Sequence, residues 1–307
     1  MRFNLVCICF IVSCCTYTLY SFARQRARTL GLTKNIVIPF TLTAHNNIVV
    51  QALLNETDTI RLMFSTASDG VYLIKDFTGK LKSLRLNSLQ DTVRSWGNSV
   101  HLSRSSENNA LRIGDNVWKN LSITEDINSS FETDGKFGMA LFTGKVVEID
   151  FERLLIIVST KLPLKVKQYK KLKLFNLDGL SLVEATCKTA RSVSSRLFLL
   201  HSGYEGGLLL SDSCEPEPCL KDELPIFGEQ ILENAYGEKI RSTQSVMPTF
   251  FLGGYVLKNV QIGFFEGLLN NSRINVAGCD IIKRFNLIID AERQNIFVRP
   301  SHLKPSK

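Results

Sequence analysis

Histidine and tryptophan are scarce in this sequence of 307 residues, which contains four His and two Trp. The histidines stand far apart, at positions 45, 101, 201 and 302. Because a zinc site needs a convergent set of ligands, we expect no metal and no cofactor. A basic chain often binds nucleic acid, but no zinc-finger, RNP-like or helix-turn-helix pattern accompanies the net charge of +8. We therefore expect no nucleic-acid partner.

The composition excludes two further classes of protein. Hydrophobic residues make up 44% of the chain and charged residues 21%, which excludes wholesale disorder and collagen-like structure. The length allows one large domain or two of about 100–150 residues. Either arrangement can bury a core without disulfide staples. The 19 Phe residues indicate a core of medium-sized apolar groups.

An apolar run without charges, Leu5–Ala23, follows Arg2 near the start of the chain. This pattern is typical of a signal peptide, with cleavage after Ala23. Two alternatives stay open: a lipobox-like segment would place a lipid on Cys14, and an uncleaved run is long enough to anchor the chain. All three predict an exported protein that is periplasmic, secreted or envelope-associated. Residues 1–23 then lie outside the fold, and membrane contact occurs only through this N-terminus.

Four of the eight cysteines fall inside that leader and carry no information about the fold. The other four, which allow three pairings, are Cys187, Cys214, Cys219 and Cys279. Cys214 and Cys219 flank the turn-forming tetrapeptide Glu-Pro-Glu-Pro. We therefore favour a local disulfide between these two residues.

The chain contains an internal duplication. Residues 138–158 (GMALFTGKVVEIDFERLLIIV) match residues 278–298 (GCDIIKRFNLIIDAERQNIFV) at an offset of 140. Upstream, residues 111–123 match residues 250–262 at an offset of 139. Two collinear matches at nearly one offset predict two related lobes.

A third pair of segments also matches, RLMFSTASDGVY from position 61 and LFLLHSGYEGGL from position 197. Each is a short apolar strand that runs into a turn of small residues. Ser65 and His201 occupy the same place in the two turns. A strand followed by a tight turn holds a side chain at the mouth of a site on a fixed backbone.

Short apolar segments with β-branched residues, separated by Asn, Gly and Asp turns, indicate a mostly β protein. Residues 35–64 predict three antiparallel strands, and helical signal is limited to short pieces such as 279–285. One barrel-like lobe is expected from each half. We place the N-terminal lobe at 35–160, a basic, solvated linker at 161–172 and the C-terminal lobe at 173–300.

Over roughly residues 35–300 the chain resembles the pepsin/retropepsin-like aspartic peptidases, especially exported bacterial two-lobe forms. The paired turns, the two Gly-x-x-x-x-Lys-Asn segments and the closing GCDIIKRFNLIIDAERQNIFVRP carry this resemblance. It implies two pseudo-symmetric β-barrel-like lobes with a cleft between them. It also implies an Asp-Thr-Gly in each turn, with glycines that donate to the carboxylates. The two carboxylates would share a proton and polarise one water.

The chain departs from that family at the catalytic positions. The first turn reads Ser65-Thr66-Ala67 and the second His201-Ser202-Gly203, so both carboxylates are absent. The sequence therefore predicts a non-catalytic, monomeric homologue that holds an extended peptide or a protein in the cleft.

Other interpretations remain open at this point. Ser65 and His201 could act as nucleophile and base in a working peptidase, although no orienting acid or oxyanion hole is identified. Asp69 and Glu205 each lie four residues after the substituted position, so they are candidates for a displaced acid pair. The alternative for both is to cap or solvate the turns. A purely structural envelope protein is the third class.

Overall fold

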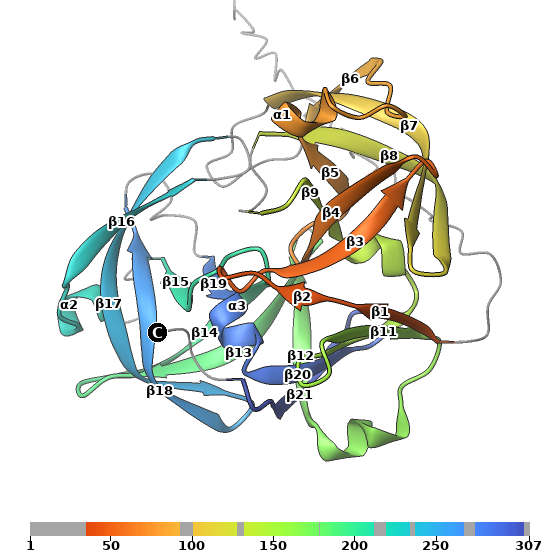
Figure 1. Ribbon diagram of the computed structural model, residues 1–307. Helices are drawn as coiled ribbons and strands as arrows, with labels where there is room; N and C mark the ends of the chain where they lie inside the picture. Colours follow the sequence, from red (N-terminus) through yellow and green to blue (C-terminus); the bar gives the residue numbers. More distant parts are fainter. Residues whose placement is uncertain are drawn as a thin grey trace, which may run out of the picture.

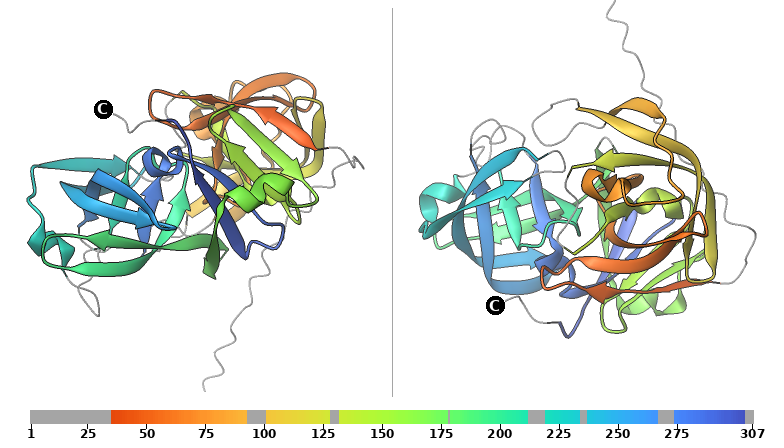
Figure 2. Two further views of the ribbon diagram at one scale, coloured as in Figure 1. Left: turned by 90° about the horizontal axis from the view of Figure 1, so that it is seen from below. Right: turned by 45° about the horizontal axis from the view of Figure 1, so that its top comes forward.

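The computed structural model describes residues 35–92, 101–127, 132–177, 179–211, 219–233, 237–266 and 274–303. These residues form two β-rich lobes that lie side by side and share one sheet between them (Figures 1 and 2). The leader predicted at residues 1–23 lies outside the described residues. Within the described ranges, no helix is both long and apolar enough to cross a bilayer.

The N-terminal lobe is built around a closed barrel of six strands. Their order is β3-β4-β9-β5-β8-β7, and β7 pairs back onto β3. The elements of this lobe are β2 (Thr41–Leu42), β3 (Ile48–Leu54), β4 (Asp58–Ser65), β5 (Val71–Ile74), α1 (Lys75–Thr78), β6 (Ser88–Thr92), β7 (His101–Ile113), β8 (Asn116–Asp126), β9 (Gly135–Gly138) and η1 (Met139–Phe142).

The C-terminal lobe repeats this barrel strand for strand, in the order β13-β14-β19-β15-β18-β17 with β17 closing onto β13. The internal duplication is therefore confirmed by the topology. The elements are β13 (Leu180–Lys188), β14 (Val193–His201), β15 (Leu208–Leu210), α2 (Leu220–Glu223), β16 (Gly228–Glu233), β17 (Lys239–Leu252), β18 (Tyr255–Phe265), β19 (Asn275–Gly278) and α3 (Cys279–Ile282).

A six-stranded interlobe sheet, ordered β1-β11-β10-β20-β21-β12, joins the two halves. The first repeated sequence supplies β10 and β11, and its copy supplies β20 and β21. The central contact is between the equivalent strands β10 and β20, where Ile149 is opposite Leu287. The elements are β1 (Ile36–Pro39), β10 (Val146–Asp150), β11 (Leu155–Ser159), η2 (Leu164–Gln168), β12 (Lys170–Leu177), β20 (Phe285–Ile289) and β21 (Asn295–Pro300).

The repeated glycines and asparagines of the second match have a conformational explanation. Gly114 and Gly253 occupy the turns that join β7 to β8 and β17 to β18, with φ values of +58° and +60°. Asn120 and Asn259 also have positive φ, at 56° and 50°. Glycine and asparagine tolerate this left-handed region better than other residues, so each half retains them at the same place.

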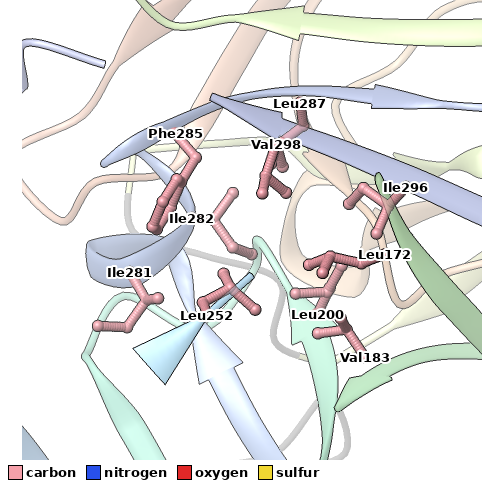
Figure 3. Close-up of a pocket in the computed structure, with 10 residues that line it drawn as sticks. All are labelled: Leu172, Val183, Leu200, Leu252, Ile281, Ile282, Phe285, Leu287, Ile296 and Val298. Atoms are coloured by element: carbon pink, nitrogen blue, oxygen red, sulfur yellow. The ribbon is translucent and has the colours of Figure 1, made fainter. Parts of the chain in front are cut away.

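The core is apolar and continuous through both lobes. Phe64 packs against Phe137 with ring centroids 5.2 Å apart, and the indole of Trp118 donates to the Leu141 carbonyl at 3.0 Å. Beneath the interlobe sheet lies a small, wholly apolar cavity of about 10 Å³ (Figure 3). Its walls are Leu172, Val183, Leu200, Leu252, Ile281, Ile282, Phe285, Leu287, Ile296 and Val298.

Two local predictions need adjustment. The helix expected over 279–285 is the shorter α3, because the chain from Phe285 onward is drawn into the fully buried strand β20. The stretch 161–172, expected to be a solvated linker, contains η2 and the start of β12. Lys170 and Lys171 pair there with Val298 and Phe297 of β21.

Candidate functional site

The two turns singled out by the sequence lie at equivalent places in the two lobes. β4 ends at Ser65, which is opposite Gly138 of β9 in a parallel pairing. β14 ends at His201, which is opposite Gly278 of β19 in the same way. The matching turns and the matching glycines therefore come together within each lobe.

Thr66 and Ser202 join the two turns across the lobe boundary. The Thr66 N–H donates to Ser202 Oγ, and the Ser202 N–H donates to Thr66 Oγ1, both at 3.0 Å. Each hydroxyl then donates onward, Thr66 to the Leu200 carbonyl at 2.6 Å and Ser202 to the Phe64 carbonyl at 2.8 Å. These four hydrogen bonds between buried groups fix the two turns relative to each other. Ser65 immediately precedes Thr66 and His201 immediately precedes Ser202, so both residues are held on neighbouring turns.

Gly138 and Gly278 allow the strands beside the turns to approach closely. A Cβ on Gly138 would lie 1.8 Å from the Ser68 carbonyl oxygen, and one on Gly278 would lie 2.3 Å from the Gly206 carbonyl oxygen. Any side chain would therefore displace backbone. This explains why glycine occurs at both positions of the repeat.

Ser65 is almost completely buried, at 1% exposure. Its hydroxyl forms no hydrogen bond in the described part of the chain. A nucleophilic serine must instead be hydrogen-bonded to its base. The structure brings Ser65 and His201 onto neighbouring turns but does not connect them as nucleophile and base.

His201 already uses one ring nitrogen in its own turn. The Gly203 N–H donates to His201 Nδ1 at 3.1 Å, the bond that the resemblance assigns to a carboxylate. A neutral imidazole that accepts at Nδ1 carries its proton on Nε2. Burial, and then the positive charge of Lys136, lower the pKa of His201 to about 4. The side chain is therefore neutral at pH 7 and is a weak base.

Lys136 was not expected from the sequence. Its Nζ forms an ion pair with Asp126, and the two side chains are 13% and 3% exposed. The ammonium also lies over the Tyr72 ring, 5.2 Å from the centroid. The repeat contains a signal that would have found it, because Lys136 aligns with Val276 of the other lobe. A charged residue at a position that is apolar in the other lobe indicates that the two lobes use this position differently.

The alternative acid pair, Asp69 and Glu205, is not assembled as a pair. Asp69 accepts from the Tyr72 hydroxyl at 2.8 Å within its own lobe. Glu205 is hydrogen-bonded to His45 Nδ1, and the two side chains are 37% and 40% exposed. Each carboxylate thus has a separate polar partner, whereas carboxylates that share a proton must be adjacent.

The turn between β2 and β3 of the N-terminal lobe contacts the turn that follows β14 in the C-terminal lobe. Asn46 donates to the Glu205 carbonyl at 3.1 Å, and the buried Asn47 donates to the Ser202 and Gly203 carbonyls at 3.4 Å. Lys283 donates to Asn46 Oδ1 at 2.8 Å. These contacts place the backbone around His201 in the interface between the lobes.

The other sequence candidates make different contacts. Ala67 is partly exposed and packs against an apolar cluster of the C-terminal lobe. Asp150 and Asp290, which occupy equivalent positions of the repeat, accept backbone N–H bonds in the turns after β10 and β20. Cys219 is disulfide-bonded, whereas its predicted partner Cys214 lies outside the described residues.

Comparisons with known proteins identify the fold and not the activity. No protein-family model matches the sequence, and no curated protein matches it. Among solved structures the chain is similar to an aspartic proteinase from Irpex lacteus, with a TM-score of 0.56 and 12% identity. The alignment covers 88% of this chain and 98% of that one. The predicted fold class is thereby confirmed: this chain has the mostly β, two-lobe fold of the pepsin-like aspartic proteinases.

Proposed function

We propose that this protein is an exported, non-catalytic homologue of the aspartic peptidases that binds an extended peptide or a protein between its lobes. One observation carries the proposal. The hydrogen-bond frame between the two turns is complete at Thr66 and Ser202, whereas the positions that it supports bear an unbonded hydroxyl and a neutral imidazole. A frame of this kind positions backbone for contact with a ligand without supplying a group that activates water.

The chemistry of a Ser65–His201 pair does not favour catalysis. General base catalysis needs a base within hydrogen-bond reach of the proton and a pKa near the working pH. His201 Nδ1 accepts from Gly203, and Ser65 Oγ has no hydrogen bond. An extended ligand can instead be held by backbone hydrogen bonds and side-chain pockets.

Two measurements on the purified chain test the proposal. Denatured casein and a library of 12-residue peptides are incubated from pH 3 to pH 8, and products are detected by mass spectrometry. Binding is detected with a photo-crosslinking residue, Asp69→p-benzoylphenylalanine, because Asp69 is exposed in the first turn. The matched control is Lys80→p-benzoylphenylalanine, which is also exposed but lies after α1.

The expected result is saturable crosslinking of peptide at position 69, none at position 80, and no cleavage. Cleavage that disappears in Ser65→Ala or His201→Ala would establish a peptidase and contradict the proposal. Absence of both cleavage and crosslinking would favour a structural protein.

A gain-of-function variant tests the frame itself. Ser65→Asp, Ala67→Gly and His201→Asp together restore the two acidic turns. We expect proteolysis at acidic pH from this variant and none from the matched Ser65→Asn, Ala67→Gly, His201→Asn variant. A folded but inactive acidic variant would argue against a frame that is competent to bind substrate.

A further inference from the structure

The lysine-rich segment 161–171 lies on the outer face of the interlobe sheet, away from the turns at Ser65 and His201. Its central part is η2, which Figure 1 shows as a green coil protruding at the lower edge, between β11 and β12. Val166 and Tyr169 pack inward against Phe297 and its neighbours on that face. The segment is therefore held in place by its inner side.

The outer side of the segment presents leucine to solvent. Leu164 is 87% exposed and Leu162 is 41% exposed. Side chains three residues apart eclipse in a 3₁₀ helix, so Val166 and Tyr169 form the inner row and Leu164 and Lys167 the outer one. Isolated exposed leucines are common on protein surfaces. Here two exposed leucines lie within three residues of each other, on a protruding segment that also carries lysines. Together they form an amphipathic surface.

The charge of this surface is not neutralised locally. The two buried carboxylates of this sheet face, Glu148 and Asp150, form ion pairs with Lys165 and Arg153. Four exposed lysines form no ion pair with any residue that the structure describes: Lys161, Lys167, Lys170 and Lys171. The segment thus combines exposed apolar side chains with excess positive charge.

The N-terminal part of the chain joins the fold at the same edge. Ile36 is opposite Val158 at the end of β11, three residues before Lys161. Upstream of the described fold, the sequence has three arginines at 24, 26 and 28 that follow the uncharged run 5–23. The described fold therefore begins at the same edge as the basic surface.

We propose that segment 161–171 docks on an anionic phospholipid bilayer, with Leu162 and Leu164 entering the interface and the lysines contacting headgroups. This proposal goes beyond the N-terminal membrane contact expected from the sequence and is independent of ligand binding between the lobes. Interfacial protein surfaces combine an apolar side with lysines, and each lysine near an anionic bilayer strengthens binding about five-fold. A nucleic acid or an acidic protein would use the lysines but not the exposed leucines.

Tryptophan fluorescence on the full chain tests the proposal even if the N-terminus also contacts lipid. In Leu164→Trp, we expect emission to shift to shorter wavelength with phosphatidylglycerol-containing vesicles and to be quenched by brominated acyl chains. Vesicles of phosphatidylcholine alone should cause neither change. The matched control is Leu102→Trp, because Leu102 is 70% exposed on β7 of the N-terminal lobe; its emission should not respond.

Charge reversal tests the electrostatic part. In the Leu164→Trp background, Lys161→Glu with Lys167→Glu should weaken vesicle binding by at least about 25-fold. Lys75→Glu with Lys80→Glu changes the net charge equally at α1 and just after it, and should have no effect; Figure 1 shows α1 at the top of the molecule.

Three results would overturn the proposal: no spectral shift at position 164, an equal shift with neutral vesicles, or equal losses from the two charge reversals. Binding to heparin without a response to vesicles would assign the surface to a soluble polyanion instead. Crosslinking at position 69 reports on the interlobe ligand separately, so neither outcome depends on the other.

Discussion

Thr66 and Ser202, which are 136 residues apart in sequence, each donate a backbone N–H to the other's hydroxyl across the lobe boundary. Both residues are buried. This reciprocal contact aligns the two turns across the boundary between the lobes.

Removal of the Thr66 hydroxyl should destabilise the protein. Thr66→Val keeps the branched shape but leaves the Leu200 carbonyl and the Ser202 N–H without these bonds. Each buried group left unpaired costs about 1–3 kcal/mol. We expect a loss of at least about 2 kcal/mol in the free energy of unfolding, measured in urea. Thr59→Val, at an exposed position of β4, is the control; equal losses in the two variants would contradict the prediction.

Stability should fall as the pH decreases from 6.5 towards 4 because the fold desolvates the His201 side chain and favours its neutral form. The unfolded chain takes up a proton near pH 6.5, whereas the pKa of folded His201 is about 4. The stabilisation is therefore complete above pH 6.5 and is lost as the pH falls from 6.5 to 4. The loss in the free energy of unfolding is on the order of 3 kcal/mol.

His201→Asn should remove this part of the pH dependence while retaining an acceptor for the Gly203 N–H. Urea unfolding at pH 7 and at pH 4.5 measures it, with His302→Asn as the control because His302 is highly exposed. If His201→Asn loses as much stability between the two pH values as the wild type does, His201 is not responsible.

The positive charge of Lys136 should contribute to the lowered pKa of His201. Lys136→Met alone would strand the buried Asp126 carboxylate, at a cost of about 3–5 kcal/mol, so the test uses Lys136→Met with Asp126→Asn. We expect the pKa of His201 to rise in this variant, because Lys136 contributes to lowering it. NMR titration of the imidazole Cε1–H resonance measures the change, and an unchanged His201 pKa would exclude the electrostatic role.

Gly138 and Gly278 should not tolerate even a methyl group. Their backbone φ values, −118° and −85°, are ordinary, so the effect of alanine is steric and not conformational. With carbonyl oxygens at 1.8 Å and 2.3 Å from the new Cβ, each change should cost about 3 kcal/mol or more. Thermal unfolding measures this loss. Gly79→Ala, which meets nothing within 4 Å, should be neutral or stabilising.

Much of the fold was predictable because local patterns in the sequence specify it. The repeats, the alternating apolar segments and the turn glycines predicted a duplicated β protein, and the barrels confirm it. Local patterns failed at two places. At α3, burial of β20 shortens the expected helix. In 161–172, the lysines suggested a solvated linker, but inward packing of Val166 and Tyr169 orders the segment.

The sequence by itself determined that two strand–turn units recur and that neither carries an acid at the position of Ser65 or His201, because residue identity and spacing are properties of the covalent chain. Only the tertiary structure decided what those residues do. Whether Ser65 meets a base, whether His201 is neutral, and whether Lys136 lies near it depend on burial and on contacts between segments distant in sequence. Such contacts arise from packing of the two lobes, which no local pattern of residues specifies.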